Sequence, residues 1–332
     1  MSTASAPHPA GTGRAPMAEI VFWLVLAAGF WLWPSYLPLA SQVLIAGLFA
    51  LSFDLVLGYA GIVSLGHAAY FGVGAYAAGV LSKLGWGEPF SGLLFAALCA
   101  GVTGFLTSFL VVRGKDLTRL MVTTGIGLLL FELANRLTGI TGGNDGLIGM
   151  EMSPVLGAFR FDMYGKVAYG YSLAVTFVLF LVMRRLVNSP FGLSLRGIRD
   201  NPGRMLALGY PVHRRLIAMY TLASVYAGIA GALLAQTTQF VGTDVLSFNR
   251  SAELMVMLIV GGTGMLYGGL VGAAVFMVAH HYLSGINPTY WQFWLGAFLI
   301  AIVMFGRDGV LGACLRLARA WRARIAKPAA RT

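Results

Sequence analysis

Long apolar runs, separated by short polar or glycine-rich segments, dominate the chain. The longer runs have about 18–24 residues, and an α-helix needs about 20 apolar residues to cross a bilayer. A transmembrane β-barrel would show alternating ten-residue segments instead. The pattern therefore predicts an all-α polytopic membrane protein. About ten transmembrane helices are expected, at 19–35, 39–57, 63–83, 89–112, 117–138, 167–187, 213–236, 251–265, 267–284 and 289–306.

Two glycine-rich stretches interrupt this pattern: GYAGIVSLGHAAYFGVGAY at 58–76 and GGTGMLYGGLVGAA at 261–274. Non-helical backbone persists at membrane depth only where protein or a water-filled cavity covers its polar groups. Such breaks often line transport pathways, and the alternative is a tight turn between ordinary spans. If two short segments are re-entrant, eight spans replace ten. Translocation-path candidates in the breaks are Gly58, Ser64, Gly66, His67, Gly261 and Gly262.

The composition agrees with a membrane protein, because 58% of the 332 residues are hydrophobic and 11% are charged. Soluble domains carry about 25% charged residues. The net charge of +11 is interpreted by position, since Lys and Arg collect in cytoplasmic loops. With the N-terminus inside, 18 of the 23 basic residues are cytoplasmic and 5 are external. This predicts an N-in, C-in topology. No basic stretch is interleaved with stacking aromatic residues, which argues against nucleic-acid binding.

Three regions follow from this topology. Residues 1–18 are expected to be a disordered cytoplasmic N-terminus, 19–306 the transmembrane domain, and 307–332 a basic cytoplasmic tail. Between two spans, the external segment 139–166 contains the turn-rich stretch TGGNDG. It either gates a pathway or simply covers the bundle. The external gate candidates are Gly142, Gly143, Asn144 and Asp145.

Motifs for catalysis are missing from the sequence. There is no His-Glu-x-x-His, no Gly-x-Ser-x-Gly and no phosphate-binding Gly-x-x-x-x-Gly-Lys-Ser/Thr motif. No third ligand at suitable spacing accompanies the two adjacent histidines, His280 and His281. We therefore expect no enzyme, no metal site and no cofactor bound by this chain. Ionisable residues within spans are functional candidates, so a secondary transporter driven by an ion gradient through Asp54, His67 or Glu132 is an alternative.

The basic stretch NSPFGLSLRGIRDNPGRMLALGYPVHRR, residues 188–215, has the signals of a structured loop. Ser189–Pro190 and Asn201–Pro202 each combine a capping residue with proline at the first helical position. Gly209 supplies a helix stop. These signals predict two short cytoplasmic helices, at about 190–200 and 202–208. One side is apolar and suited to docking, and the other is charged, which favours a protein partner over anionic lipid.

Part of this loop, GIRDNPGRMLALGYPVHRRLIAMYTLASVYAGIAGALLA, resembles the cytoplasmic coupling loop of ABC-importer permeases. Three further blocks resemble the LivH/LivM family of branched-chain amino acid permeases, and its LivM-like branch in particular. They are LGYAGIVSLGHAAYFGVGAYAAGVL, TGGNDGLIGM and SAELMVMLIVGGTGMLYGGLVGAA. Four blocks in the same order over roughly residues 40–310 make the resemblance specific.

The resemblance implies a permease subunit in a bacterial inner membrane, which forms the translocation path for branched-chain or related amino acids. It implies a LivH-like second permease subunit, two cytoplasmic ATPase subunits that bind ATP and Mg, and a periplasmic or surface substrate-binding protein, with membrane lipid around the spans. Related permeases carry urea, short amides and aromatic amino acids, so the substrate within the family stays open.

The resemblance also implies a role for the coupling loop, 188–212, which would fit a groove on an ATPase subunit. Family loops often carry an acidic residue and an alanine pair before the glycine, whereas this chain has GRMLALG. This difference affects the individual ATPase contacts and not the role of the loop. The ATPase-coupling residues that the resemblance implies are Arg196, Arg199, Asp200, Asn201, Arg204 and Gly209.

Overall fold

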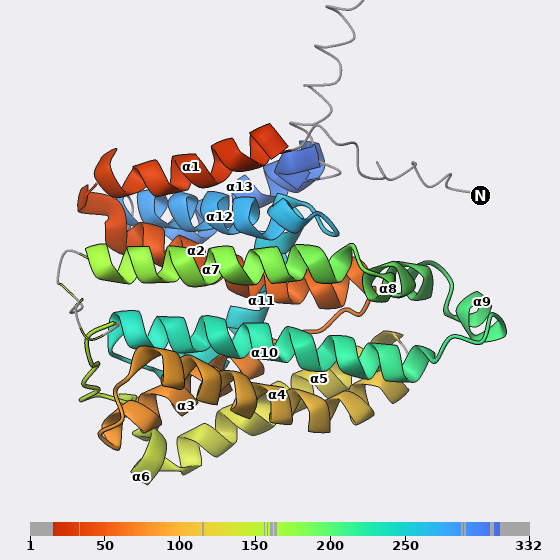
Figure 1. Cartoon of the computed structure of the whole chain (residues 1–332), viewed down its shortest axis with the longest axis horizontal. Helices are drawn as coiled ribbons and strands as arrows, with labels where there is room; N and C mark the ends of the chain where they lie inside the picture. Colours follow the sequence, from red (N-terminus) through yellow and green to blue (C-terminus); the bar gives the residue numbers. More distant parts are fainter. Residues whose placement is uncertain are drawn as a thin grey trace, which may run out of the picture.

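The computed structural model describes residues 16–32, 34–114, 116–155, 157, 159, 162, 165–286, 288, 290–305 and 309–312. The expected N-terminal segment before residue 16 and most of the expected basic tail lie outside these residues. The described part is a bundle of helices that lie side by side (Figure 1). Two isolated β-bridges, Leu147–Val241 and Val155–Phe159, join loop segments.

Each of the ten expected spans overlaps a helix of the structure. The long helices are α1 (Pro16–Leu32), α2 (Leu37–Asp54), α3 (Ala68–Lys83), α4 (Pro89–Arg113), α5 (Asp116–Arg136), α7 (Lys166–Val187), α10 (Val212–Thr238), α11 (Phe248–Gly261), α12 (Leu266–Ile286) and α13 (Trp291–Phe305). The short elements are η1 (Pro34–Tyr36), the π-helix η2 (Leu55–Tyr59), α6 (Thr138–Thr141), η3 (Gly143–Asp145), α8 (Pro190–Asp200), α9 (Pro202–Ala207) and η4 (Thr243–Leu246).

Six helical segments among the described residues are long and apolar enough to cross a membrane. They are Pro34–Tyr59, Pro89–Arg113, Leu117–Arg136, Lys166–Val187, Val212–Thr238 and Leu266–Ile286. The other four long helices, α1, α3, α11 and α13, have 17, 16, 14 and 15 residues. At 1.5 Å per residue they are about 21–26 Å long, which is less than the ~30 Å hydrocarbon core. The all-helical membrane class is confirmed, whereas the count of ten spans stays a prediction.

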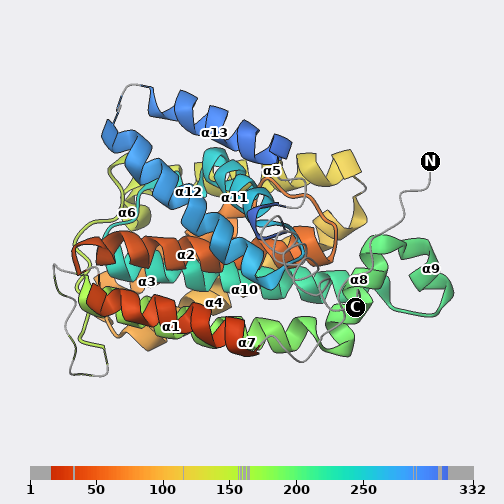
Figure 2. The ribbon, with the colours of Figure 1, turned by 90° about the horizontal axis from the view of Figure 1, so that it is seen from above.

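The bundle has two distinct ends. Helices α8 and α9 project from one end, and α6 lies at the other (Figure 1). Helix α2 lies inside the bundle and contacts α7, α10, α11 and α12. Seen from above, α13 and α1 follow opposite edges of the molecule, with α2 between them (Figure 2). Most of α2 after Gly47 is buried, so residues of this helix can transmit changes between the elements around it.

Small residues let α10 approach α3 and α4 closely. Gly228 and Gly231 of α10 lie against the backbones of neighbouring helices, and a Cβ atom at Gly231 would overlap the carbonyl oxygen of Phe71 in α3. A Cβ at Gly228 would overlap Ala100 in α4. Small residues at helix contacts are the usual means of tight packing in membranes. Helix α10 thus packs against both α3 and α4.

Each glycine-rich stretch contains a short non-helical segment in the structure, and the two segments differ in kind. The first is an irregular segment at 60–67, between η2 and α3. Two of its polar groups are covered by protein: Leu65 N donates to Thr123 Oγ1 over 3.4 Å, and Gly61 N donates to Leu57 O over 3.1 Å. The second is a four-residue turn at 262–265, which joins α11 to α12. It matches the tight-turn interpretation of the sequence.

Candidate functional site

The helix pair predicted in the basic loop is present. Helix α8 ends at Asp200, and α9 begins at Pro202. The Asn201 side chain caps α9, since its Oδ1 accepts a hydrogen bond from Arg204 N over 2.9 Å. Ser189 is the residue before α8, but its hydroxyl does not cap the helix. It donates instead to Leu186 O, in the last turn of α7, over 2.6 Å.

Gly209 ends the pair as the sequence predicts. Its φ angle is +81°, a conformation that glycine adopts without strain. Gly209 N donates to Leu206 O over 2.9 Å, and Tyr210 N donates to Met205 O over 3.1 Å. These two bonds form a Schellman motif, which satisfies the last carbonyls of α9.

Helix α8 is attached to the bundle by both of its faces. Leu195 and Ile198 are buried in the main hydrophobic core. On the charged face, Arg196 does not point away from the bundle, because its guanidinium lies over the Tyr59 ring at 5.1 Å. The charged side expected to face a partner therefore partly faces the chain itself.

Arg199 makes the most consequential contact of the loop. Its Nη1 donates a hydrogen bond to the carbonyl oxygen of Gly58 in η2, at the start of the first glycine-rich break. A Cβ at Gly61 would lie 2.6 Å from Arg199 Cγ, so the absence of a side chain there makes room for the arginine. Arg199 Nε also lies 3.5 Å from Asp200 Oδ1 on the exposed side. Arg199 thus connects α8 to the non-helical segment.

Asp54 brings the second glycine-rich break to the same place. This buried carboxylate accepts a 2.7 Å hydrogen bond at Oδ1 from Gly264 N, in the turn between α11 and α12. Its other oxygen, Oδ2, has no hydrogen-bond partner among the described residues. The positive charge of Arg199 acts on Asp54 electrostatically. Two segments about 200 positions apart, Gly58 and Gly264, therefore meet beside one arginine of the helix pair.

Helix α9 has the opposite character, because it is exposed along its length. The side chains of Leu206 and Leu208 are 56% and 64% exposed, and Tyr210 beyond them is 42% exposed. Arg204 is exposed beside them. Clustered apolar side chains with a charge on a projecting element are typical of a protein docking surface. We call Arg204, Leu206, Leu208 and Tyr210 the α9 tip.

The other translocation-path candidates are packed inside the bundle. His67 stacks on Phe49 at 5.9 Å, and its Nε2 lies 3.0 Å from Ser52 Oγ. A Cβ at Gly66 would overlap the Thr123 carbonyl. Ser64 is buried, while Gly261 lies against Gly268 and Gly262 begins the turn. These positions hold helices together, and their place on a path stays a prediction.

The external gate candidates lie at the end of the bundle opposite α8 (Figure 1). Gly142 and Gly143 have φ angles of +77° and +58°, and η3 carries Asn144 and Asp145 into solvent. The following residue, Gly146, packs against Phe240 after α10. The segment therefore covers α10 and also exposes two polar side chains, which is compatible with both interpretations of the sequence.

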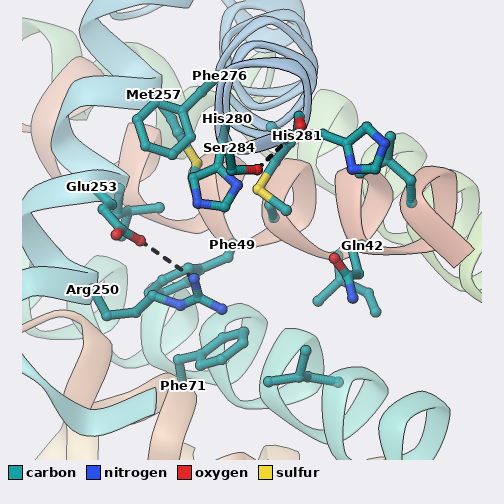
Figure 3. Close-up of a pocket in the computed structure, with 16 residues that line it drawn as sticks. Gln42, Phe49, Phe71, Arg250, Glu253, Met257, Phe276, His280, His281 and Ser284 are labelled. Atoms are coloured by element: carbon teal, nitrogen blue, oxygen red, sulfur yellow. Dashed lines mark hydrogen bonds and ion pairs between the residues drawn. The ribbon is translucent and has the colours of Figure 1, made fainter. Parts of the chain in front are cut away.

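A cavity that sequence analysis did not anticipate lies in the half of the bundle away from α8. It has a volume of about 340 Å³ and is bounded by α2, α3, α10, α11 and α12. Arg250 and Glu253 of α11 form an ion pair at its edge, with 3.3 Å between Nη1 and Oε2 (Figure 3). His280 and Gln42 line it from α12 and α2. No sequence motif marks these residues, which lie on three separate helices.

The other titratable candidates have structural partners. Glu132 and Arg136 form an intrahelical ion pair, with 2.8 Å between Oε1 and Nε, and both side chains are exposed. Within the described residues, no group of three His, Cys, Asp or Glu side chains could hold a metal ion.

The chain is similar in sequence to a known family of membrane transport proteins. Residues 35–303 match the family model described as the permease component of branched-chain amino acid transport systems. The chain is 26% identical over 319 residues to the high-affinity branched-chain amino acid transport permease LivM of Escherichia coli, covering 88% of this chain and 74% of the relative. It is 23% identical over 299 residues to a probable LivM of Methanocaldococcus jannaschii, covering 77% and 85%.

A third relative has another substrate in its name. The chain is 24% identical over 222 residues to the galactose/methyl galactoside import permease MglC of Haemophilus influenzae, which covers 64% of this chain and 65% of the relative. No solved structure matches the chain.

Proposed function

The chain belongs to the family of permease components of branched-chain amino acid transport systems, and on that premise we propose that it forms part of the translocation path of an ATP-driven importer. The substrates are branched-chain or related amino acids, as the names of the LivM relatives indicate. A LivH-like permease is the second membrane subunit, since a probable LivH also matches this chain. Two ATPase subunits hold ATP and Mg, and a separate binding protein delivers the substrate.

One observation carries the proposed mechanism: the helix pair has an exposed outer end, and its inner end is bound to Gly58 in the first glycine-rich break, beside Asp54, which binds the second. The α9 tip docks on an ATPase subunit. Arg199 then transmits the movement of α8 to Gly58 and, through Asp54, to Gly264. The coupling residues of the loop thus divide into two groups. Arg204 and Gly209 belong to the docking side, whereas Arg196 and Arg199 belong to the permease side.

Uptake assays with the partner ATPase inactivated test this function. Reconstituted vesicles should take up leucine only when ATP is inside the compartment that holds α9 and the ATPase is intact. Uptake that persists with an inactive ATPase, or that follows an imposed proton or sodium gradient, would favour the secondary-transporter alternative and contradict the proposal.

The proposed topology has ten spans with both ends in the cytoplasm, so that α9 is inside and η3 is outside. The test uses a chain in which Cys99 and Cys314 are replaced by alanine. Two variants of this chain each carry one new cysteine, Arg204→Cys in the first and Asn144→Cys in the second. A membrane-impermeant thiol reagent should label Asn144→Cys in intact spheroplasts and Arg204→Cys only in inverted vesicles. Labelling of both positions from the same side would contradict the topology.

Charged substitutions on the α9 tip should release the ATPase. Fully burying a leucine side chain contributes about 1.5–3 kcal/mol, so the double variant Leu206→Glu/Leu208→Glu should weaken ATPase association at least about tenfold. Copurification of ATPase with tagged permease measures this. Ile148→Glu is the matched control, because Ile148 is 64% exposed and lies in the segment at the opposite end. Equal ATPase recovery from both variants would contradict docking through α9.

A further inference from the structure

The cavity between α2, α3, α10, α11 and α12 combines charged and apolar walls. Its charged wall is the Arg250–Glu253 pair, two residues three positions apart in the first turns of α11. Both side chains are partly exposed, at 30% and 38%, and both line the cavity. Its apolar wall consists of Ile45, Phe49, Phe71, Leu254, Met257 and Phe276.

The geometry of the pair leaves binding capacity unused. One guanidinium nitrogen contacts one carboxylate oxygen over 3.3 Å, a long and single contact. An arginine carries five N–H donors and a carboxylate can accept about four hydrogen bonds. Figure 3 shows both charged groups at the edge of the cavity, with the Phe71 ring beside Arg250. The Arg250 guanidinium lies 6.0 Å from the centre of that ring, which holds it beside the apolar wall.

A ligand that complements these walls must carry one positive and one negative charge close together. Its carboxylate can take paired hydrogen bonds from Arg250, its ammonium group can donate to Glu253, and its apolar side chain can contact the phenylalanine rings. A free α-amino acid with an apolar side chain meets all three conditions. A sugar has no charge for either group. The volume of about 340 Å³ is near the lower limit of the roughly 300–1,000 Å³ typical of small-molecule sites.

We propose that this cavity is a binding site for a zwitterionic, apolar amino acid within the permease, with Arg250 binding its carboxylate and Glu253 its ammonium group. The inference rests on the proposed function, because it places the transported amino acid at a particular point of the path. The site lies on the halves of α11 and α12 far from Asp54 and Gly264, which is the external half in the proposed topology.

Thiol protection in the assembled importer tests the site without relying on transport. Ser284 lines the cavity, so Ser284→Cys, in a chain with Cys99→Ala and Cys314→Ala, provides a reporter. Bound leucine should slow the reaction of this cysteine with a thiol reagent. Isoamylamine, which has only the amine, and 4-methylpentanoate, which has only the carboxylate, should protect far less. Galactose should not protect.

Adding Glu253→Gln should raise the leucine concentration for half-protection at least about tenfold, because the amide still accepts a hydrogen bond but no longer offers a negative charge to the ammonium group. Glu132→Gln is the matched control, since Glu132 also pairs with an arginine one turn away on its own helix but lies outside the cavity. It should leave protection unchanged.

Absent protection, equal protection by the three ligands, or an unchanged response in Glu253→Gln would each overturn the inference. Leucine uptake by the same preparation reports on the proposed function separately. Uptake without protection refutes the site and leaves the function in place. Protection without ATP-driven uptake supports the site and refutes the function.

Discussion

An importer with Arg199→Met should hydrolyse ATP while importing amino acid about 10- to 100-fold more slowly. A hydrogen bond with a charged donor contributes about 1.5–3 kcal/mol, and each 1.4 kcal/mol corresponds to a factor of ten. The substitution removes the bond from α8 to Gly58 and the positive charge beside Asp54. Methionine keeps much of the apolar stem that fits against Gly61. ATPase copurification should be unchanged, because the α9 tip is untouched.

Three measurements on one preparation check this result: ATPase recovery, ATP hydrolysis and leucine uptake. Arg185→Met is the matched control, since Arg185 is an exposed arginine at the same end of the bundle, in the last turn of α7. It should behave as the unmodified protein in all three assays. If Arg199→Met keeps full uptake, Arg199 does not transmit the movement; if it loses the ATPase, Arg199 belongs to the docking surface instead.

Gly231→Leu should prevent the chain from accumulating as a folded protein. A side chain at this position overlaps the Phe71 carbonyl of α3, and a backbone atom cannot move aside without separating α3 from α10. Overpacking typically costs 1–3 kcal/mol where side chains can adjust, so a cost of about 3 kcal/mol or more is expected here. Because Phe71 also lines the cavity, any chain that does fold should have a distorted binding site.

Size-exclusion profiles of detergent extracts, before and after a temperature ramp, measure this effect. Gly125→Leu is the control, because a Cβ at Gly125 in α5 meets nothing within 4 Å. Its profile should match that of the unmodified chain. A normal, monodisperse Gly231→Leu peak with an unchanged thermal midpoint would show that α3 and α10 pack less tightly than the structure indicates.

Local signals in the sequence were sufficient for the helix pair. Asn201 followed by Pro202, and Gly209 seven residues after Pro202, determine the start and the stop of α9 through bonds within a few residues. The same is true of the Glu132–Arg136 pair. Capping and intrahelical pairing depend on spacing along one segment, so a sequence contains the information directly.

Long-range contacts could not be predicted in the same way. The meeting of Asp54, Gly264 and Arg199 joins three segments whose approach depends on how α2, α8 and α11 pack. The charged cavity likewise requires the register of α11 against α2 and α12. Nothing in the sequence places Phe71 beside Arg250. Ser189 shows a smaller limit, because its hydroxyl donates to a carbonyl of α7 and accepts no capping hydrogen bond from α8.

Helix α11 connects the turn at 262–265, at its C-terminal end, to Arg250 near its N-terminal end. Its last residue, Gly261, adjoins the turn bound by Asp54, and Arg250 lies 11 residues earlier, about 16 Å along the axis. A tilt of about 10° at the turn would displace Arg250 by about 3 Å, which is enough to break a hydrogen bond of ordinary length. A small rotation that begins at Arg199 can therefore be amplified into release of a bound amino acid, with the helix acting as a lever.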